Sequence, residues 1–373
     1  MIRLLHIADV HLGKTFKQLG RRGAEQRRAL QAALARAVDL AIEQGVVAVL
    51  IAGDLFDTPR ASDTLIRFVG QQLQKLDTAG IATFLIAGNH DIGPHGRVGP
   101  AAELAGAGGR VRLVGSEPEI HTLSEHDLTI VARSALPGQP RSPLLGWPAF
   151  RPSRFVVGVA HGSTFRAGQV EGPHVIHPQA IKDLRLDYLA LGDWHSAFEV
   201  LPPPTTAWYA GAPEWLGFDQ PGSGQVLLVE LDTPGAARVT PVPIGQRRAV
   251  RREFDAGQVD DAGLRTALTE AADPALVFEA VLTGLMPLHR TINVEGIEQE
   301  FAERFFRLRI TNKSRVWLDQ AQLEVFPPQT VLGRFVRLMR DRIAAAPDAE
   351  RPVLEEALQI GAAVVSGRGE VLV

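Results

Sequence analysis

Residues 4–14 read LLHIADVHLGK, and this short stretch decides how the N-terminal half of the chain is interpreted. An apolar run begins at residue 2 and stops abruptly at Asp9, as a buried strand does where it leaves a sheet. His11 follows two residues later, so a polar Asp-x-His cluster stands directly after the predicted strand 2–8. Taken alone, such a cluster is more often a turn or a cap than a pair of ligands.

The same arrangement recurs twice before residue 92. Apolar positions at helical spacing predict two helices, and apolar runs predict two strands that stop at Gly53-Asp54 and Gly88-Asn89. In chain order these elements are a helix over 24–44, a strand over 46–52, a helix over 63–79 and a strand over 81–87. Strands alternating with helices at this spacing predict a βαβ-type layered fold with buried strands.

Shorter strands follow in the second part of the chain. The clearest are 155–160 and 186–191, and two more candidates are 225–231 and 237–242. Together they predict a sandwich of two sheets flanked by helices, in an α/β layered fold. The chain turns basic and irregular around 241–252, so we expect a domain boundary there and one large domain over 1–245. Residues 246–373 would form a smaller α+β domain, with helices over 258–272, 331–345 and 349–360 and strands over 276–282 and 307–311.

The composition limits the chemistry of any site. The 373 residues, 45% of them hydrophobic, can bury a sizeable core, and no apolar run has the length of a membrane span, so we expect a cytoplasmic protein with no membrane partner. There is no cysteine, which leaves His, Asp, Glu and Asn as ligands for a metal. The net charge of −3 does not favour a nucleic-acid partner, although a local basic patch would be enough to bind one.

Five polar clusters share one property, since each directly follows a predicted strand. They are Asp9-Val10-His11, Gly53-Asp54-Leu55-Phe56-Asp57, Gly88-Asn89-His90-Asp91, His161-Gly162 and Gly192-Asp193-Trp194-His195. Ligands in layered α/β folds bind at the carboxyl ends of the strands, so these clusters can converge on one point. A pair of divalent cations needs such a convergence, with oxygen and nitrogen donors for each ion and one carboxylate between them. Any single cluster reads better as a turn or a core residue, but five in order favour a metal centre.

The order of these clusters resembles the calcineurin-like metallophosphoesterase superfamily. Within it, four stretches are similar to the SbcD / meiotic-recombination-eleven branch of DNA repair nucleases and to the YhaO-type proteins close to that branch. They are LLHIADVHLGK at 4–14, AGDLFDTPR at 52–60, AGNHD at 87–91 and LALGDWH at 189–195. The resemblance covers the region 1–245 and implies a catalytic domain there, with 246–373 as a capping domain that binds DNA and a partner.

Carried over to this chain, the resemblance implies two divalent metal ions and a hydroxide, activated by them, that attacks phosphorus in line. The implied ligands are Asp9, His11 and His195 for one ion and Asn89, His161 and Asp193 for the other, with Asp54 bridging both. His90 would be catalytic, because it matches a histidine that contacts the phosphate and helps the leaving oxygen depart. Asp57 and Asp91 are candidates for orienting these residues.

The chain departs from the branch at one ligand. Most of the branch has His-x-His where this chain has Asp193-Trp194-His195. With Asp9 and Asp54, Asp193 brings three carboxylates to two divalent ions, which leaves a formal charge of about +1. We therefore expect tighter ion binding, weaker activation of water and a preference for Mn²⁺, with Mg²⁺, Fe²⁺ and Zn²⁺ also open.

The branch implies a metal-dependent DNA exonuclease or endonuclease of DNA repair, working with an SbcC-type coiled-coil ATPase and open to forming a homodimer. Three basic clusters could follow a DNA backbone, although each also suits an ordinary solvated surface. They are Arg21, Arg22, Arg27 and Arg28; Arg307, Arg309, Lys313 and Arg315; and Arg334, Arg337 and Arg340. Two other functions stay open: a phosphomonoesterase or cyclic-nucleotide phosphodiesterase, and a catalytically weak assembly subunit. The sequence indicates neither the polarity of digestion nor the metal used in the cell.

Overall fold

The computed structural model describes residues 1–92, 99, 103–104, 106–135, 142–164, 175–218, 220, 222–287, 292–317 and 326–365. The chain divides into two compact units, Met1–Arg248 and Ala249–Val373, and each unit has its own hydrophobic core. The boundary expected after residue 245 lies close to this division. Within the described ranges, no helix combines the length and the apolar character that crossing a membrane requires.

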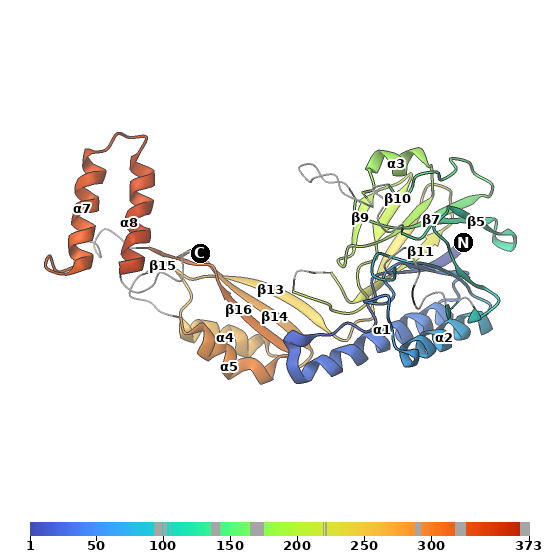
Figure 1. The fold of residues 1–373 in the computed structure, drawn as a ribbon, viewed down its shortest axis with the longest axis horizontal. Coiled ribbons are helices and arrows are strands. Elements are labelled where there is room, and N and C mark those ends of the chain that lie inside the picture. Colours follow the sequence, from blue (N-terminus) through green and yellow to red (C-terminus); the bar gives the residue numbers. More distant parts are fainter. Residues whose placement is uncertain are drawn as a thin grey trace. The chain divides into compact units, whose positions relative to one another are not determined.

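Two six-stranded mixed sheets form the first unit (Figure 1). The first has the order β12-β11-β1-β2-β3-β4, and the second has the order β5-β6-β7-β8-β10-β9. The strands of the first sheet are β1 (Ile2–Ile7), β2 (Ala48–Ala52), β3 (Ala82–Ile86), β4 (Val111–Leu113), β11 (Gln225–Leu231) and β12 (Arg238–Pro243). Those of the second are β5 (Glu119–Leu123), β6 (Leu128–Ala132), β7 (Phe155–His161), β8 (Tyr188–Gly192), β9 (Phe198–Leu201) and β10 (Thr206–Tyr209).

The main core of the first unit lies between the two sheets. Leu4, Leu50 and Phe84 from the first sheet belong to the same buried cluster as Val157 and Tyr188 from the second. The strands β2, β3, β7 and β8 are buried along their whole length, which explains why their sequences are apolar without alternation. In the first sheet β1, β2 and β3 run parallel, so their carboxyl ends point the same way.

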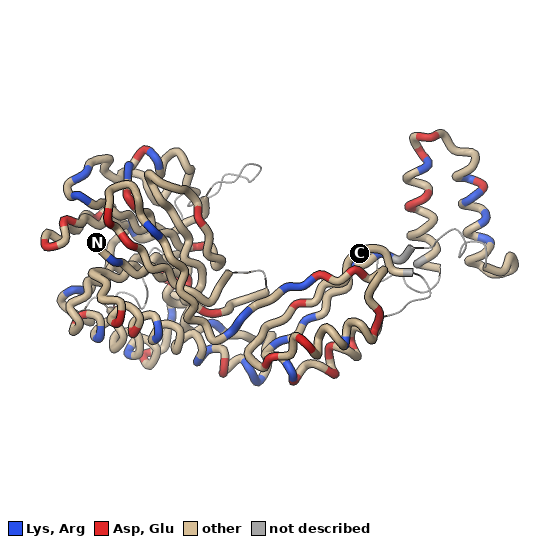
Figure 2. The backbone as a smooth tube through the Cα atoms, turned by 180° about the vertical axis from the view of Figure 1, so that it is seen from behind, with Lys and Arg blue, Asp and Glu red and all other residues tan. Residues whose placement is uncertain are grey.

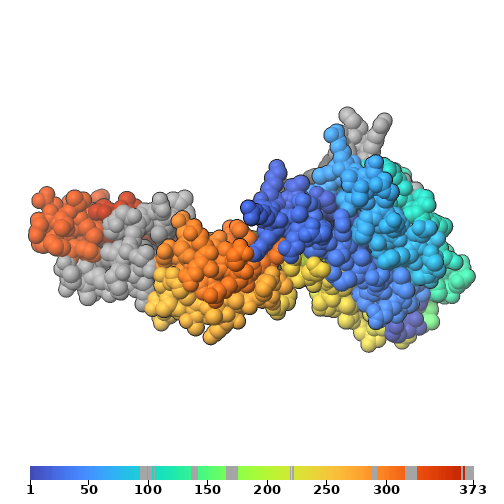
Figure 3. Space-filling model, turned by 90° about the horizontal axis from the view of Figure 1, so that it is seen from below, coloured from blue at the N-terminus to red at the C-terminus, as the bar shows by residue number. Residues whose placement is uncertain are grey.

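Two helices connect the parallel strands of the first sheet. They are α1 (Gly23–Glu43) and α2 (Asp63–Thr78), and Figure 3 shows both on the outer surface of this unit, in dark and lighter blue. Helix α2 begins after Ser62, whose side chain caps it by accepting a hydrogen bond from the Leu65 N–H. A short helix, α3 (Pro178–Asp183), contributes Ile181 to the core outside the second sheet. The prediction of a two-sheet α/β fold flanked by helices is confirmed.

The second unit is built on the three-stranded sheet β13-β14-β16. Leu264 and Leu268 of α4, and Ile297 and Phe301 of α5, pack with Phe278 of β14 in its core. The elements of this unit are β13 (Arg248–Asp255), α4 (Asp261–Ala271), β14 (Leu276–Thr283), β15 (Leu285–Pro287), α5 (Val294–Phe301), β16 (Arg307–Asn312), β17 (Arg315–Trp317), α7 (Val331–Ala345) and α8 (Arg351–Val365). Helices α7 and α8 pack against each other as a hairpin (Figure 1).

One prediction around this second unit was wrong, and one of its helices was not predicted. The segment 241–252 is not irregular, because β12 and β13 occupy most of it. Of the eight residues of β13 only Phe254 is buried, so the strand lacks the apolar alternation by which a half-buried strand is recognised. Helix α5 was not predicted, although Asn293 caps it by accepting from the Gly296 N–H.

Candidate metal centre

Five strand ends carry the predicted site residues, three in the first sheet and two in the second. Asp9, Asp54 and Asn89 lie just beyond β1, β2 and β3, whereas His161 is the last residue of β7 and Asp193 follows β8 directly. Across the core, β2 lies against β7 and β8, and β3 lies against β7. The carboxyl ends of strands from both sheets therefore converge on one place, where ligands bind in layered α/β folds.

Backbone hydrogen bonds tie the loops after β1 and β2 together beyond the sheet. The Asp9 N–H donates to the Gly53 carbonyl at 3.1 Å, and the His11 N–H donates to the Asp54 carbonyl at 3.0 Å. Asp9, His11 and Asp54 adopt left-handed backbone conformations, with φ of 52°, 49° and 50°. Such conformations cost roughly 1–3 kcal/mol each in a residue other than glycine, and they gather at functional sites because the surrounding structure enforces them.

Two glycines allow the strand ends to approach closely. A Cβ added at Gly88 would lie 2.2 Å from Asp54 Oδ1, and one added at Gly192 would lie 2.0 Å from the Ala52 carbonyl oxygen. Neither contact is compatible with van der Waals radii, and the Ala52 oxygen is backbone that cannot rotate away. Glycine at these positions is therefore a condition for bringing Asp54 and Asp193 into the same site.

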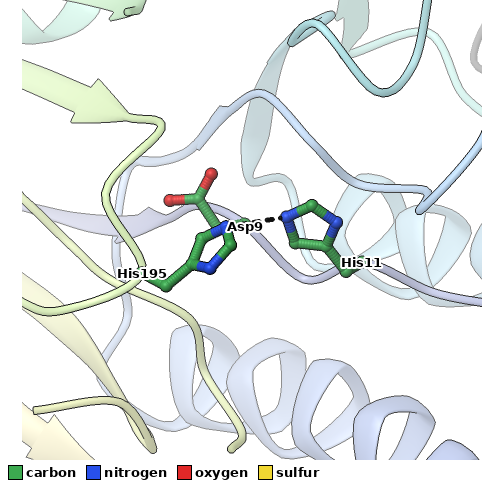
Figure 4. Close-up of side chains that lie close together, drawn as sticks. All are labelled: Asp9, His11 and His195. Carbon is green, nitrogen blue, oxygen red and sulfur yellow. Dashed lines mark hydrogen bonds between the residues drawn. The ribbon is translucent and has the colours of Figure 1, made fainter. Parts of the chain in front are cut away.

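The first group of donors consists of Asp9, His11 and His195, shown in Figure 4. The Nε2 atoms of the two histidines lie 3.0 Å apart. The Nδ1 of His11 is 3.2 Å from Asp57 Oδ1, and the Nδ1 of His195 is 2.6 Å from Gln220 Nε2. Each ring thus has its Nδ1 engaged and its Nε2 turned toward the other, which is how imidazoles that share a metal are held.

The second group consists of Asn89, His161 and Asp193. His161 Nε2 lies 2.9 Å from Asn89 Oδ1 and 3.8 Å from Asp193 Oδ1, while its Nδ1 donates to the Ala52 carbonyl at 2.9 Å. Asp54 joins the two groups, because its Oδ2 lies 3.6 Å from His11 Nε2 and also 3.6 Å from His161 Nε2. One carboxylate oxygen at equal distance from both groups is the arrangement that a bridging ligand requires.

The electrostatics of the site favour cations. Asp9, His11, Asp54 and His161 are buried, while Asn89 is exposed, so the site is closed at its base and open at one side. Burial raises the pKa of Asp9 well above its ordinary value. Burial alone would lower the pKa of His161, but the carboxylates of Asp54, Asp9 and Asp193 outweigh it and raise that pKa to about 9. A positive charge is thus stabilised among these carboxylates.

The donor chemistry fits a pair of divalent cations. Gln220 Oε1 is buried and has no hydrogen-bond partner among the described residues. A half-turn of this amide would place Oε1, and not Nε2, beside Nδ1 of His195. That Nδ1 would then carry the hydrogen and donate it to Oε1, which leaves Nε2 of His195 free as a metal ligand. All donors are nitrogen or oxygen, as Mn²⁺, Mg²⁺, Fe²⁺ and Zn²⁺ accept. The residues therefore suit the two ions that the sequence implied.

His90 stands at the edge of this site. Its backbone N–H donates to Asp54 Oδ1 at 2.9 Å, and its Nδ1 lies 2.9 Å from the Asp57 carbonyl oxygen. A carbonyl oxygen can only accept, so Nδ1 carries the hydrogen and Nε2 is the atom that can exchange a proton. Burial alone would raise the pKa of Asp57, but the bond from His11 and the ammonium of Lys14, 3.4 Å away, lower it.

The structure brings all eight predicted site residues together and adds supporting ones. Asp91 was expected to have an orienting role, and it accepts hydrogen bonds from the backbone N–H groups of Leu55, Phe56 and Gly88. Ser163, which donates to Asp193 Oδ2, and Gln220 were not predicted. Neither residue belongs to a recurring pattern, although Ser163 lies only two residues after His161.

The basic clusters are less prominent in space than in sequence. In the cluster over 307–315, Arg309 lies 3.7 Å from Glu279 and Arg315 lies 3.5 Å from Glu356. Two of its four basic residues therefore have a carboxylate nearby. Figure 2 shows basic and acidic residues interspersed along the described chain. A phosphate-binding surface is therefore not evident from charge alone.

Two known proteins share stretches of sequence with this chain. The uncharacterized metallophosphoesterase YhaO of Bacillus subtilis (strain 168) is 31% identical over 94 residues, 24% of this chain and 23% of that protein. The DNA double-strand break repair protein Mre11 of Methanopyrus kandleri is 33% identical over 123 residues, 32% of this chain and 26% of that protein. The matches thus span about a quarter of the length of these relatives.

A solved structure and a family model complete the comparison. The protein TT1561 of Thermus thermophilus aligns with 64% of this chain and 98% of that chain, at 13% identity and a TM-score of 0.41. The model described as calcineurin-like phosphoesterase matches residues 2–197, which is more than half of the chain and includes every predicted site residue. The weaker similarities to YhaO and Mre11 agree with the suspected branch. The chain belongs to the calcineurin-like phosphoesterase family.

Proposed function

We propose that this chain is a metal-dependent DNA phosphodiesterase of the repair type, which hydrolyses phosphodiester bonds as an exonuclease or endonuclease. The observation that carries the proposal is the position of Asp54 Oδ2, which lies 3.6 Å from His11 Nε2 in the first donor group and 3.6 Å from His161 Nε2 in the second. Family membership supports phosphoester hydrolysis as the chemistry. The similarity to proteins named for DNA double-strand break repair supports DNA as the substrate.

Seven side chains would hold the two ions, most readily Mn²⁺. Asp9, His11 and His195 would bind one, and Asn89, His161 and Asp193 the other, with Asp54 shared. Once bound, the ions would acidify water and offset charge on the phosphoryl oxygens. The protein's part is to fix these donors through the loops around β1 and β2 and to keep the base of the site closed to solvent.

His90 would donate a proton to the departing oxygen. Because its Nδ1–H is engaged by the Asp57 carbonyl, only Nε2 can give a proton to the leaving alkoxide. Asp57 also orients His11, so one residue sets the geometry of a ligand and of the proton donor together. Lys14, beside Asp57, would keep that carboxylate ionised.

The second unit would cap the site, guide DNA and dock a partner. On the α7–α8 hairpin the apolar side chains of Leu338, Val353 and Val364 are 63%, 68% and 53% exposed, while Val336 and Met339 face inward. Exposed apolar side chains on paired helices suit docking against the base of a coiled coil, as in an SbcC-type ATPase. We expect Leu338→Asp to lose binding to the ATPase and the neighbouring Arg337→Ala to keep it. Equal binding by both variants would contradict the proposal.

The function is tested by comparing substrates. Purified protein with Mn²⁺ is expected to cut linear duplex DNA far faster than it hydrolyses 4-nitrophenyl phosphate or its diester. His90→Ala should lower kcat on DNA by about a hundredfold or more, since general acid catalysis is worth that much. The variant keeps the backbone N–H that orients Asp54, so the loss reports on the ring, and the exposed His126→Ala is the matched control.

Three results would argue against the proposal. Faster turnover of small phosphate monoesters than of DNA would indicate a phosphomonoesterase. Uptake of two ions without cleavage of either substrate class would indicate an assembly subunit with a structural metal site. DNA binding that does not weaken with salt would also argue against a surface that follows phosphates.

A further inference from the structure

The two donor groups of the metal centre differ in chemistry. Around His195 the donors are two imidazole nitrogens and the Asp9 carboxylate. Around His161 they are one imidazole nitrogen, the amide oxygen of Asn89 and the carboxylate of Asp193. Asp54 adds one oxygen between the groups. The first position is therefore balanced between nitrogen and oxygen, whereas the second is dominated by oxygen.

Asp193 is held so that one oxygen faces the second group. Its Oδ2 accepts the hydroxyl of Ser163, and its Oδ1 lies 3.8 Å from His161 Nε2. Its backbone N–H donates to both carboxylate oxygens of Asp9, at 3.0 and 3.2 Å. Its φ of 113° is one that few residues other than glycine adopt. The hydrogen bonds of its backbone N–H and of Oδ2, together with the constrained backbone, hold this carboxylate in place and leave Oδ1 to bind a metal.

Donor type controls which cation a site prefers. Zn²⁺ binds more tightly than Mn²⁺ to most sites, and imidazole increases this advantage while carboxylate and carbonyl oxygens reduce it. Because Asp54 is shared, each position has two carboxylates, and the positions differ in the amide oxygen of Asn89, which stands where the first position has a second imidazole.

We infer that the two positions are not equivalent: Mn²⁺ alone fills both, but where Zn²⁺ competes the position around His195 takes Zn²⁺ and the position around His161 still selects Mn²⁺ or Mg²⁺. Asp193, oriented by Ser163, is the residue that sets this selectivity. The inference rests on the proposed two-ion site and adds that the ions differ. A mixed-metal centre is its direct consequence.

The test measures metal binding and needs no substrate. The protein is stripped with a chelator, exposed to Zn²⁺ together with a large excess of Mn²⁺, desalted and analysed for both elements. Calorimetric titration with each metal alone gives the two dissociation constants. The variants are Asp193→His, which supplies a nitrogen; Asp193→Asn, which keeps an oxygen and tolerates the left-handed backbone; and Ser163→Ala. Glu199→Gln, an exposed carboxylate on β9, is the control.

Wild type should retain one Zn²⁺ and one Mn²⁺ per chain. Asp193→His should bind two Zn²⁺, with the ratio of Zn²⁺ to Mn²⁺ affinity rising about tenfold or more at one position only. Asp193→Asn and Ser163→Ala should weaken Mn²⁺ binding about tenfold at that same position, and the control should not change. Two ions of the same element in wild type, or equal affinities in all variants, would overturn the inference while leaving a two-ion site. No ion uptake would overturn the metal centre itself.

Discussion

Replacing His6 with asparagine should remove a large part of the acid sensitivity of the first unit. His6 lies on β1, is fully buried, and its Nδ1 is 2.8 Å from the hydroxyl of Tyr188 on β8. Burial lowers its pKa from 6.5 to about 3. Above pH 6.5 the ring is neutral in both the folded and the unfolded chain, so its full contribution to stability is present there.

The magnitude follows from this difference in pKa. As the pH falls below 6.5, the unfolded chain takes up a proton that native His6 refuses, and stability is lost progressively until the pH reaches about 3. About pH 5 lies about 1.5 pH units below the pKa of 6.5 that the ring has in the unfolded chain, and this gap corresponds to a loss of about 2 kcal/mol in the free energy of unfolding. Because the folded pKa of about 3 lies well below this pH, native His6 stays neutral during the measurement.

Urea unfolding with chelator present, followed by tryptophan fluorescence, measures the effect. Four of the five tryptophans, Trp147, Trp194, Trp208 and Trp215, lie in the unit that contains His6. The quantity to compare is the free energy of unfolding of wild type minus that of His6→Asn, at about pH 7.5 and about pH 5. This difference should shrink by about 2 kcal/mol at the lower pH. A difference independent of pH would show that His6 is not the group responsible.

Three further predictions concern packing and positioning. Gly192→Ala should destabilise the protein by about 3 kcal/mol or more, because the added Cβ would lie 2.0 Å from the Ala52 carbonyl oxygen. Gly70→Ala, in open space on α2, should stabilise it by about 0.5–1 kcal/mol. Thermal unfolding compares the two variants, and equal shifts in melting temperature would contradict the argument. Gln220→Leu should weaken binding of one metal ion about tenfold without changing the melting temperature of the chelated protein, and unchanged calorimetry would refute its role. Asp187→Asn should destabilise by about 2–4 kcal/mol, since this buried carboxylate binds Arg151 and two backbone N–H groups; an unchanged urea midpoint would contradict this.

The parts of the fold that the sequence predicted are those whose burial leaves a local pattern. β2 and β3 are buried on both faces, so they appear as short apolar runs, and a glycine follows each within two residues, where the chain turns. The site could be predicted for the same reason, because polar residues that follow several such runs in order are rarely a set of unrelated turns. The wrong prediction over 241–252 lies where burial is slight, since β13 exposes nearly all of its residues and has no apolar alternation.

The supporting residues of the site could not be predicted, because they depend on tertiary contacts. Gln220 meets His195 from 25 residues away, in a loop whose sequence does not indicate its path. Ser163 is close to His161 in sequence, but only the folded chain places its hydroxyl on Asp193. The convergence of the strand ends was expected from the sequence, but which strands face each other across the two sheets depends on tertiary contacts.

A crystal grown with Mn²⁺ and measured at the manganese absorption edge tests the metal centre most directly. Two anomalous peaks are predicted, one on each side of Asp54 Oδ2, the first in contact with His195 and the second with His161 and Asp193. Anomalous density confined to surface carboxylates, or a single ion that does not touch Asp54, would contradict the assignment.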